Sequence, residues 1–148
     1  MLHDLARLYS TSRLIDECEL RGMPIDRFER ENPIVLHARL GAAIAEESFG
    51  VHDPQVLSAI EKHTVAAAEM SPLDCVLYLA DGLEPGRKYA EREELWRLAC
   101  SDLTEAMRAT IAQSLGYLER QGLAAAPQTL AAAKAFGLAI EGGSPSLN

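Results

Sequence analysis

Signals that start and stop helices recur at short intervals along this chain of 148 residues, and they limit its fold more than any other feature. Asp53 and Ser71 each precede a proline, which is the arrangement of an N-cap followed by proline in the first helical turn. Gly22, Gly50 and Gly122 follow segments of helical apolar periodicity, where glycine commonly ends a helix. Strand-like alternation is absent from the sequence. We therefore predict an all-α fold, a helical bundle of about seven to eight helices.

The expected helices can be assigned residue ranges from these signals. They cover residues 12–21, 26–31 (a single short turn), 35–48, 53–63, 71–81, 91–100, 102–121 and 127–140. Asp102 and Glu105 resemble a capping box at the start of the seventh. No repeat or change of composition separates a second domain, so residues 1–140 are predicted to form one domain. Residues 141–148 are rich in glycine, serine and proline, and we expect them to be a flexible tail.

Composition and charge exclude several classes of partner. A net charge of -8 disfavours a nucleic-acid surface, because such surfaces rely on cationic contacts to phosphate. Cys18, Cys75 and Cys100 show no C-x-x-C spacing, which argues against a disulfide framework or a zinc knuckle. No apolar run is long enough to span a bilayer, and the N-terminus lacks the pattern of a signal peptide. We expect a cytoplasmic protein with neither nucleic acid nor a membrane as its partner.

Several chemically active side chains fall on apolar segments. His3 and Asp4 form a His-Asp pair near the start, and His37, His63 and Asp81 lie on the apolar faces of three further predicted helices. Inward-facing polar groups without partners are costly, since burial disfavours the charged form. One explanation covers all five residues, namely that they converge on metal ions. Histidine nitrogen with carboxylate oxygen suits iron, manganese or zinc, and a bridging aspartate suits a two-metal centre.

Each of these residues also has a purely structural interpretation. A lone inward histidine is more often a hydrogen-bonded core residue than a ligand, and Asp81 could simply cap its helix or pair with Arg87. Asp4 could be an acid favoured by a helix dipole. Their joint occurrence favours the metal site. His52 and Asp53 form a second His-Asp pair, but Asp53 precedes a proline and is predicted to be a helix cap without a metal role.

Cations near these residues suggest a phosphate ligand. Arg7 follows His3 by one helical turn, and Arg87 follows the loop Glu84-Pro85-Gly86 just beyond Asp81. The planar guanidinium group suits phosphate through two parallel hydrogen bonds. Lys62 and Lys88 are interpreted as solvated surface charges, and Trp96 as a packed anchor.

The motifs that carry these residues resemble those of a known family. They are His3-Asp4-Leu5-Ala6-Arg7, Leu36-His37, Ile60 through His63-Thr64, Met70-Ser71-Pro72-Leu73 and, above all, Tyr78 through Arg87. The sequence resembles the YqeK-type branch of the HD superfamily as far as about Thr129. This resemblance implies an HD-domain helical bundle and a symmetrical bis(5'-nucleosyl)-tetraphosphatase, which converts diadenosine tetraphosphate to two ADP with a metal-activated water.

The resemblance also implies a set of metal ligands. His3, Asp4 and Asp81 would bind one metal ion, and His37 and His63 the other, with Asp4 bridging the two. The expected cofactor is a divalent metal, binuclear iron first and manganese second. Two such cations would polarise the phosphoryl oxygens and lower the pKa of a water between them.

Substrate contacts follow from the same resemblance. Asp4 and Arg7 are the expected catalytic residues, and Arg7, Thr64 and Arg87 are expected to bind the substrate, a dinucleoside polyphosphate or nucleotide. A homodimer is left open. Two other functions stay open at this stage: an HD phosphohydrolase acting on another nucleotide, and a non-catalytic nucleotide-binding protein with a degraded metal site.

Three departures from the family pattern bear on these alternatives. A helix upstream of the His-Asp pair carries a further metal histidine in the family, and this sequence starts beyond it. Either a longer chain supplies that helix or the site binds metal with one ligand fewer. The family's His-Thr-Thr-Gly segment reads His63-Thr64-Val65-Ala66 here, and Cys75 stands where a basic residue is common.

Overall fold

The computed structural model describes residues 2–140, which form eight α-helices and two short 3-10 turns, with no β-strand in that range. The helices are α1 (Thr11–Leu20), α2 (Arg27–Glu31), α3 (Leu36–Phe49), α4 (Pro54–Lys62), α5 (Pro72–Gly82), α6 (Arg92–Ala99), α7 (Leu103–Arg120) and α8 (Pro127–Ala135), and the 3-10 turns are η1 (Leu2–Asp4) and η2 (Pro33–Val35). The predicted all-α fold is therefore confirmed. The expected flexible tail lies outside the described residues.

The helix starts agree with the capping signals in the sequence. Asp53 accepts hydrogen bonds from the backbone N–H groups of Gln55 and Val56 at the start of α4. Ser71 forms a capping box at the start of α5. Asp102 accepts from the backbone N–H of Glu105 at 2.9 Å, so the first half of the expected box at α7 is present. These side chains satisfy backbone donors that have no partner within the helix.

The last helix ends earlier than predicted. α8 stops at Ala135, whereas the sequence pattern extended it to residue 140. Gly137 adopts a φ of +77°, and the N–H of Leu138 donates to the carbonyl of Ala133 at 2.9 Å. A left-handed glycine with this backward hydrogen bond is a common helix C-terminus. The alanine-rich composition concealed this stop signal.

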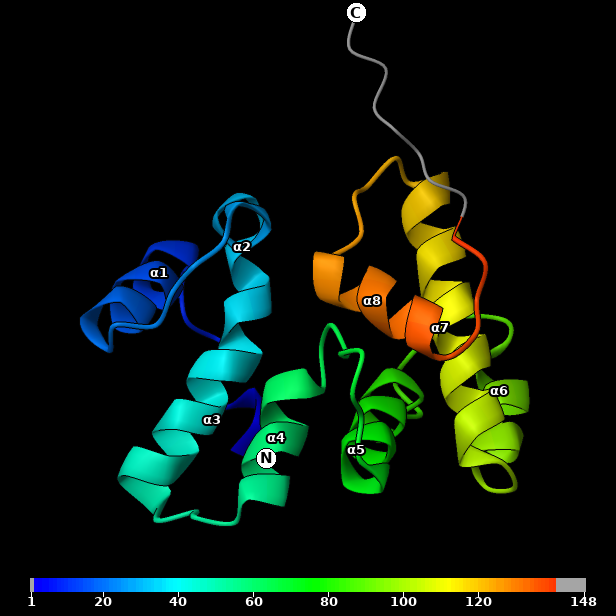
Figure 1. Ribbon diagram of the computed structural model, residues 1–148, viewed down its shortest axis with the longest axis horizontal. Helices are drawn as coiled ribbons and strands as arrows, with labels where there is room; N and C mark the ends of the chain where they lie inside the picture. The colour runs from blue at the N-terminus through cyan, green and yellow to red at the C-terminus, as the bar shows by residue number, and fades with distance from the viewer. Residues whose placement is uncertain (1, 141–148) are drawn as a thin grey trace, which may run out of the picture.

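The helices form a continuous series of neighbours in which α3 packs on α4, α4 on α5, and α5 on α7 (Figure 1). A core cluster around Leu14, Leu36 and Leu40 joins α1 to α3. A larger cluster, which includes Leu83 and Met107, joins α5 to α6, α7 and α8. The turn η1 contacts both α3 and α4. The His-Asp pair therefore enters the fold between helices that carry the other candidate ligands.

Two predictions about the exposure of side chains were wrong. Lys62 was interpreted as a solvated charge, but its ammonium group donates to Asp74 Oδ2 at 3.0 Å and to the Glu69 carbonyl at 2.9 Å. Asp74 is fully buried, and a buried carboxylate requires a cationic or hydrogen-bonding partner. Trp96 was interpreted as a packed anchor, but it is 45% exposed because Leu95 takes the buried position of α6.

Among residues 2–140, no helix is both long enough and apolar enough to cross a bilayer.

Candidate metal centre

The His-Asp pair lies in a short turn that is packed tightly against α3. The turn is held by a hydrogen bond from the Arg7 N–H to the Asp4 carbonyl at 2.9 Å. A Cβ atom at Gly41 of α3 would lie 3.3 Å from the backbone carbonyl oxygen of His3. Glycine at this helix position therefore allows the backbone of the turn to approach α3 closely. This approach places the His3 and Asp4 side chains beside α3 and α4.

We expect Gly41→Val to push the His-Asp turn away from α3. Overpacking of this kind costs about 1–3 kcal/mol of folding stability, and it should also weaken metal binding. Thermal unfolding and metal content per chain measure the two effects. Gly116→Val is the matched control, because the nearest atom there belongs to the movable end of Arg120. Equal effects of the two substitutions on metal content would contradict the role assigned to Gly41.

His37 and His63 are buried histidines whose Nε2 atoms face each other. The Nδ1 atom of His37 contacts the carbonyl oxygen of Ile34 at 2.5 Å, and that of His63 contacts Ile60 at 2.6 Å. Because a carbonyl only accepts, Nδ1 carries the proton in both rings, and in the neutral form Nε2 presents a lone pair. The two Nε2 atoms lie 3.2 Å apart. Two facing lone pairs repel each other unless a cation lies between them.

Burial keeps these two histidines neutral. Desolvation lowers the pKa of His37 below its ordinary 6.5, and the nearby Arg7 guanidinium adds to the effect. Burial likewise lowers the pKa of His63, with repulsion from His37 and His3 acting in the same direction. A neutral imidazole is the form that binds metal, so both side chains are prepared as ligands without a pH change.

The lowered pKa values predict how the metal-free protein responds to acid. Below pH 6.5 the unfolded chain takes up protons at His37 and His63 while the folded protein does not, so stability falls as the pH drops toward the folded pKa values. Above pH 6.5 these residues leave stability unchanged. Thermal unfolding against pH, in the presence of a chelator, measures the effect. The exposed His52 provides the control: His52→Gln should follow the wild-type curve, whereas His37→Asn with His63→Asn should flatten it.

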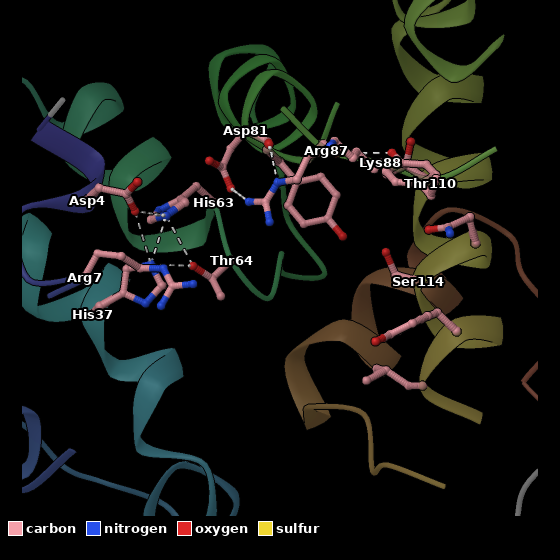
Figure 2. A pocket seen from close by; sticks show the side chains of 16 residues that line it. Asp4, Arg7, His37, His63, Thr64, Asp81, Arg87, Lys88, Thr110 and Ser114 are labelled. Carbon is pink, nitrogen blue, oxygen red and sulfur yellow. Dashed lines mark hydrogen bonds and ion pairs between the residues drawn. The ribbon is translucent and has the colours of Figure 1, made fainter. Parts of the chain in front are cut away.

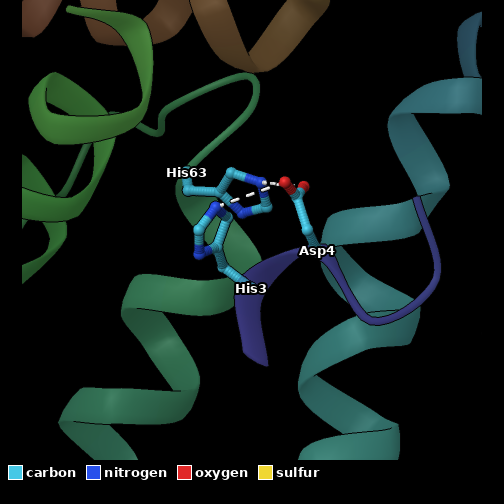
Figure 3. A group of neighbouring side chains, drawn as sticks. All are labelled: His3, Asp4 and His63. Carbon is cyan, nitrogen blue, oxygen red and sulfur yellow. Dashed lines mark ion pairs between the residues drawn. The ribbon is translucent and has the colours of Figure 1, made fainter. Parts of the chain in front are cut away.

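Asp4 faces candidate ligands on two sides. Its Oδ1 atom lies 3.6 Å from His37 Nε2 and 3.8 Å from His63 Nε2. Its Oδ2 atom lies 3.5 Å from His3 Nε2, which in turn lies 3.5 Å from Asp81 Oδ1. Figure 3 shows His3 and His63 pointing toward the Asp4 carboxylate. The five residues thus form two groups that share Asp4.

The spacing of these atoms fits the donor set of a metal centre. Separations of 3.2–3.8 Å are too long for strong hydrogen bonds. Ligand atoms that each lie about 2.0–2.2 Å from one ion are themselves separated by about 3–4 Å. His3, Asp4 and His63 form a compact group of potential ligands within the described residues. The two carboxylates offset two of the four positive charges of two divalent ions, which leaves net positive charge at the site to attract phosphate.

Asp81 joins this cluster to the loop that follows α5. The Arg87 guanidinium donates to Asp81 Oδ2 at 3.2 Å and to the Asp81 backbone carbonyl at 3.3 Å. Asp81 therefore makes the ion pair with Arg87 that a purely structural role would require, and it also contacts His3 as a metal ligand would. A carboxylate has two oxygens, and here each faces a different partner. Arg87 also remains 48% exposed, which leaves donors free for a ligand.

A pocket of about 610 Å³ lies between the cluster and α7 (Figure 2). Asp4, His37, His63 and Asp81 line one side of it. Thr64 lies between the two histidines, with its Oγ1 atom 3.3 Å from each Nε2. The sequence-predicted cations Arg7 and Arg87 line the pocket, and so does Lys88, which the sequence had assigned to solvent. The pocket therefore combines potential metal ligands with groups that attract phosphate.

The opposite wall of the pocket was not found from the sequence. It consists of side chains from α7 and neighbouring segments: Tyr78, Tyr89, Thr110, Gln113, Ser114, Tyr117 and Leu118. Residues 110, 113, 114 and 117 repeat at helical spacing, so they share one face of α7. That periodicity was the available signal, but a polar stripe of this kind is also typical of a solvated helix face.

The segment that departs from the family pattern forms a turn after α4. Ala66 adopts a φ of +59°, and its N–H donates to the Lys62 carbonyl at 3.0 Å. The left-handed conformation favours glycine, and glycine is the residue expected here from the family pattern. Alanine keeps this backbone conformation and adds a buried methyl group. The turn that carries His63 and Thr64 is therefore present even though Val65 and Ala66 replace the threonine and glycine of the family pattern.

Cys75 is buried in the core and does not line the pocket, so its side chain has no access to a phosphate there.

The second His-Asp pair takes no part in the pocket. His52 and Asp53 are exposed, and Asp53 caps α4 as expected.

Comparison with known proteins agrees with the assignment of the first His-Asp pair, His3 and Asp4. The sequence matches the HD domain family over residues 1–86, a range that holds all five candidate ligands. The chain belongs to the HD-domain family.

Individual relatives place the chain in the YqeK-type branch of this family. It is 30% identical over 129 residues to the symmetrical bis(5'-nucleosyl)-tetraphosphatase of Bacillus subtilis. This alignment covers 87% of the present chain and 69% of that protein. A Lactococcus lactis protein is 35% identical over 81 residues, or 55% of this chain and 42% of its own length, so the chain spans less than half of that relative.

A solved structure shows the same HD architecture. The crystal structure of a predicted HD superfamily hydrolase involved in NAD metabolism from Clostridium acetobutylicum matches with a TM-score of 0.87 and 29% identity, over 91% of this chain and 71% of that one. The HD-domain helical bundle predicted from the sequence is confirmed by this likeness. Hydrolases with this domain depend on metal ions, which agrees with the His/Asp cluster of the present chain.

Proposed function

We propose that this protein is a metal-dependent phosphohydrolase that cleaves dinucleoside tetraphosphates symmetrically, converting diadenosine tetraphosphate to two ADP. The observation that carries the proposal is the sharing of Asp4 between two groups of potential ligands in a pocket that Arg7, Arg87 and Lys88 also line. The name of the Bacillus subtilis relative supports this choice of substrate over other nucleotides. The three free cysteines suit a cytoplasmic setting.

In this proposal His3, Asp4 and Asp81 hold one divalent ion, and His37 and His63 hold the other together with Asp4. Two divalent ions, iron or manganese, supply polarisation of the phosphoryl oxygens and a water acidic enough to react near neutral pH. The backbone carbonyls of Ile34 and Ile60 fix the two histidine rings, since a hydrogen bond at Nδ1 sets both tautomer and orientation.

The remaining pocket residues act on the substrate. Arg7 and Arg87 bind and orient the polyphosphate, because their guanidinium groups line the pocket beside the cluster and can each hold two phosphate oxygens. The Thr64 hydroxyl, half-buried beside His37 and His63, positions a phosphate oxygen through a hydrogen bond. No protein nucleophile is needed, since attack by water on one central phosphorus breaks its bond to the central bridging oxygen and releases two nucleoside diphosphates.

Arg87→Ala is expected to raise the Michaelis constant about tenfold and to leave metal content unchanged. Loss of a charge-assisted hydrogen bond to phosphate accounts for an effect of this size. Steady-state kinetics with diadenosine tetraphosphate and metal analysis of the purified variant measure the two quantities. Arg97→Ala is the matched control, because Arg97 is 79% exposed on α6 and its ion pair is with Glu93. Loss of metal with an unchanged Michaelis constant would contradict the role assigned to Arg87.

Product analysis tests the proposed function directly. The purified chain is incubated with diadenosine tetraphosphate and iron or manganese under reducing conditions, and the products are separated by chromatography. ADP as the sole product supports symmetrical cleavage. AMP with ATP would contradict it, and turnover of other nucleotides alone would support the broader phosphohydrolase. No turnover of any nucleotide by the metal-loaded chain would favour a non-catalytic nucleotide-binding protein.

A further inference from the structure

The wall of the pocket formed by α7 differs chemically from the wall that carries the candidate ligands. Thr110, Gln113, Ser114 and Tyr117 share one face of the helix and all line the pocket. From residue 109 to residue 118 the helix carries no charged side chain, whereas Arg7 and Arg87 line the pocket near the candidate ligands and Lys88 lies beside Thr110 (Figure 2). In Figure 2, Ser114 projects from α7 on the side opposite Asp4, His37 and Thr64. The helix α7 itself therefore contributes only uncharged, hydrogen-bonding side chains to the pocket.

This polar face is not required by the packing of α7. The core contacts of the helix come from Ala106, Met107 and Ile111, which are fully buried in the largest core cluster. Thr110 is buried as well, but its hydroxyl oxygen has no hydrogen-bond partner among the described residues. An unpaired buried hydroxyl destabilises a folded protein, and valine would fill the same volume without that cost. The Thr110 hydroxyl is shielded from solvent and Ser114 interacts with the buried Tyr78 hydroxyl, so Gln113 and Tyr117 are the polar side chains of this face that remain available to a ligand.

The side chains along this face suit a nucleoside. Gln113 is half-buried and offers one acceptor and two donors on a planar amide, which is the group that pairs with the polar edge of a nucleobase. Tyr117 is 51% exposed at the rim and presents an aromatic surface on which a base can stack. A base and its ribose are uncharged, whereas phosphates require the cations of the opposite side.

We infer that the polar face of α7 is the nucleoside-binding wall of the pocket, with Gln113 as a specificity-determining residue that hydrogen-bonds the nucleobase edge. This inference rests on the proposed function and assigns the two parts of its substrate to the two sides of the pocket. The polyphosphate lies along Arg7 and Arg87, and the base of one nucleoside lies against α7.

The test compares a nucleotide with the same phosphates lacking a nucleoside. Isothermal titration of the manganese-loaded chain gives the affinities for ADP and for inorganic pyrophosphate, and their ratio isolates the contribution of the nucleoside. Gln113→Leu keeps the approximate volume of the side chain and removes its hydrogen bonds. We expect it to lower the affinity for ADP about fivefold and to leave that for pyrophosphate unchanged.

Thr110→Val is a control on the same face of α7, because its hydroxyl is shielded from solvent. We expect it to unfold at a temperature equal to or above that of the wild type and to change neither affinity. Thr104→Val, at an exposed position of the same helix, should likewise change neither affinity. A lower unfolding temperature for Thr110→Val would show that its hydroxyl serves the fold.

The outcomes separate this inference from the proposed function. Equal losses for ADP and pyrophosphate in Gln113→Leu, or no loss for either, would overturn the inference even if diadenosine tetraphosphate is cleaved. A wild-type chain that binds ADP no better than pyrophosphate would overturn it too. Conversely, a selective loss of ADP binding in a chain that cleaves nothing would support the nucleoside wall and contradict the hydrolytic function.

Discussion

Asp4→Asn is expected to reduce cleavage of diadenosine tetraphosphate roughly a thousandfold while the helical fold stays intact. Asp4 is the residue that both groups of candidate ligands share, with one oxygen near His37 and His63 and the other near His3. An amide of the same shape removes the negative charge that would bridge two cations. Loss of several kcal/mol of transition-state stabilisation corresponds to a rate effect of this order. Because the Asp4 side chain is 41% exposed, the substitution leaves little buried surface unsatisfied.

Asp53→Asn is the control that the sequence itself provides. Asp53 belongs to the second His-Asp pair, and its carboxylate caps α4 by accepting from the Gln55 N–H at 2.8 Å. Asparagine caps helices about as well as aspartate, so neither stability nor activity should change measurably. Initial rates, circular dichroism and metal content are compared for the two variants. Near-normal activity in Asp4→Asn, or equal losses in both variants, would refute the central position given to Asp4.

Most of the helix boundaries that were predicted correctly depend on local sequence signals. Asp53-Pro54 and Ser71-Pro72 fixed the starts of α4 and α5 because a cap and a first-turn proline act within a few residues. The end of α8 was misplaced, since Gly137 looked like one more small residue in an alanine-rich segment. The partner of Lys62 was missed for a different reason. Its contact with Asp74 bridges α4 and α5, and no local pattern encodes a contact of that kind.

The candidate site was predicted unevenly. Three of the five potential metal ligands could be selected because polar residues on apolar helix faces are rare and chemically demanding, and His3 and Asp4 because they form a His-Asp pair on an apolar segment. The α7 wall could not, because Gln113 and Tyr117 on a helix far along the chain look like solvent-exposed residues until the fold places α7 next to α5. Lys88 is exposed, as expected from the sequence, and its place at the pocket also follows only from the fold. Sequence reasoning therefore found the part of the pocket where unusual residues lie, and missed the part where ordinary residues acquire a role by position.

Asp81 and Asp74 lie on the same helix, and substituting each by asparagine is expected to give opposite results. Asp81 is half-buried at the pocket, between His3 and Arg87. Asp81→Asn should reduce activity at least a hundredfold, because a neutral amide is a poor ligand for a hard cation, whereas its oxygen can still accept from Arg87. The unfolding temperature should stay close to that of the wild type.

Asp74 instead supports the fold. Burial pushes the pKa of its carboxyl upward, but the Ser71 N–H and the Lys62 ammonium outweigh this and leave the pKa below its ordinary value. Asp74→Asn should therefore cost about 1–3 kcal/mol, because it leaves the half-buried Lys62 without its anionic partner. Metal-loaded Asp74→Asn should keep most of its activity per folded molecule at low temperature. If Asp81→Asn instead unfolds the protein and keeps its activity when folded, Asp81 is a structural acid like Asp74, and the site would have to be assigned without it.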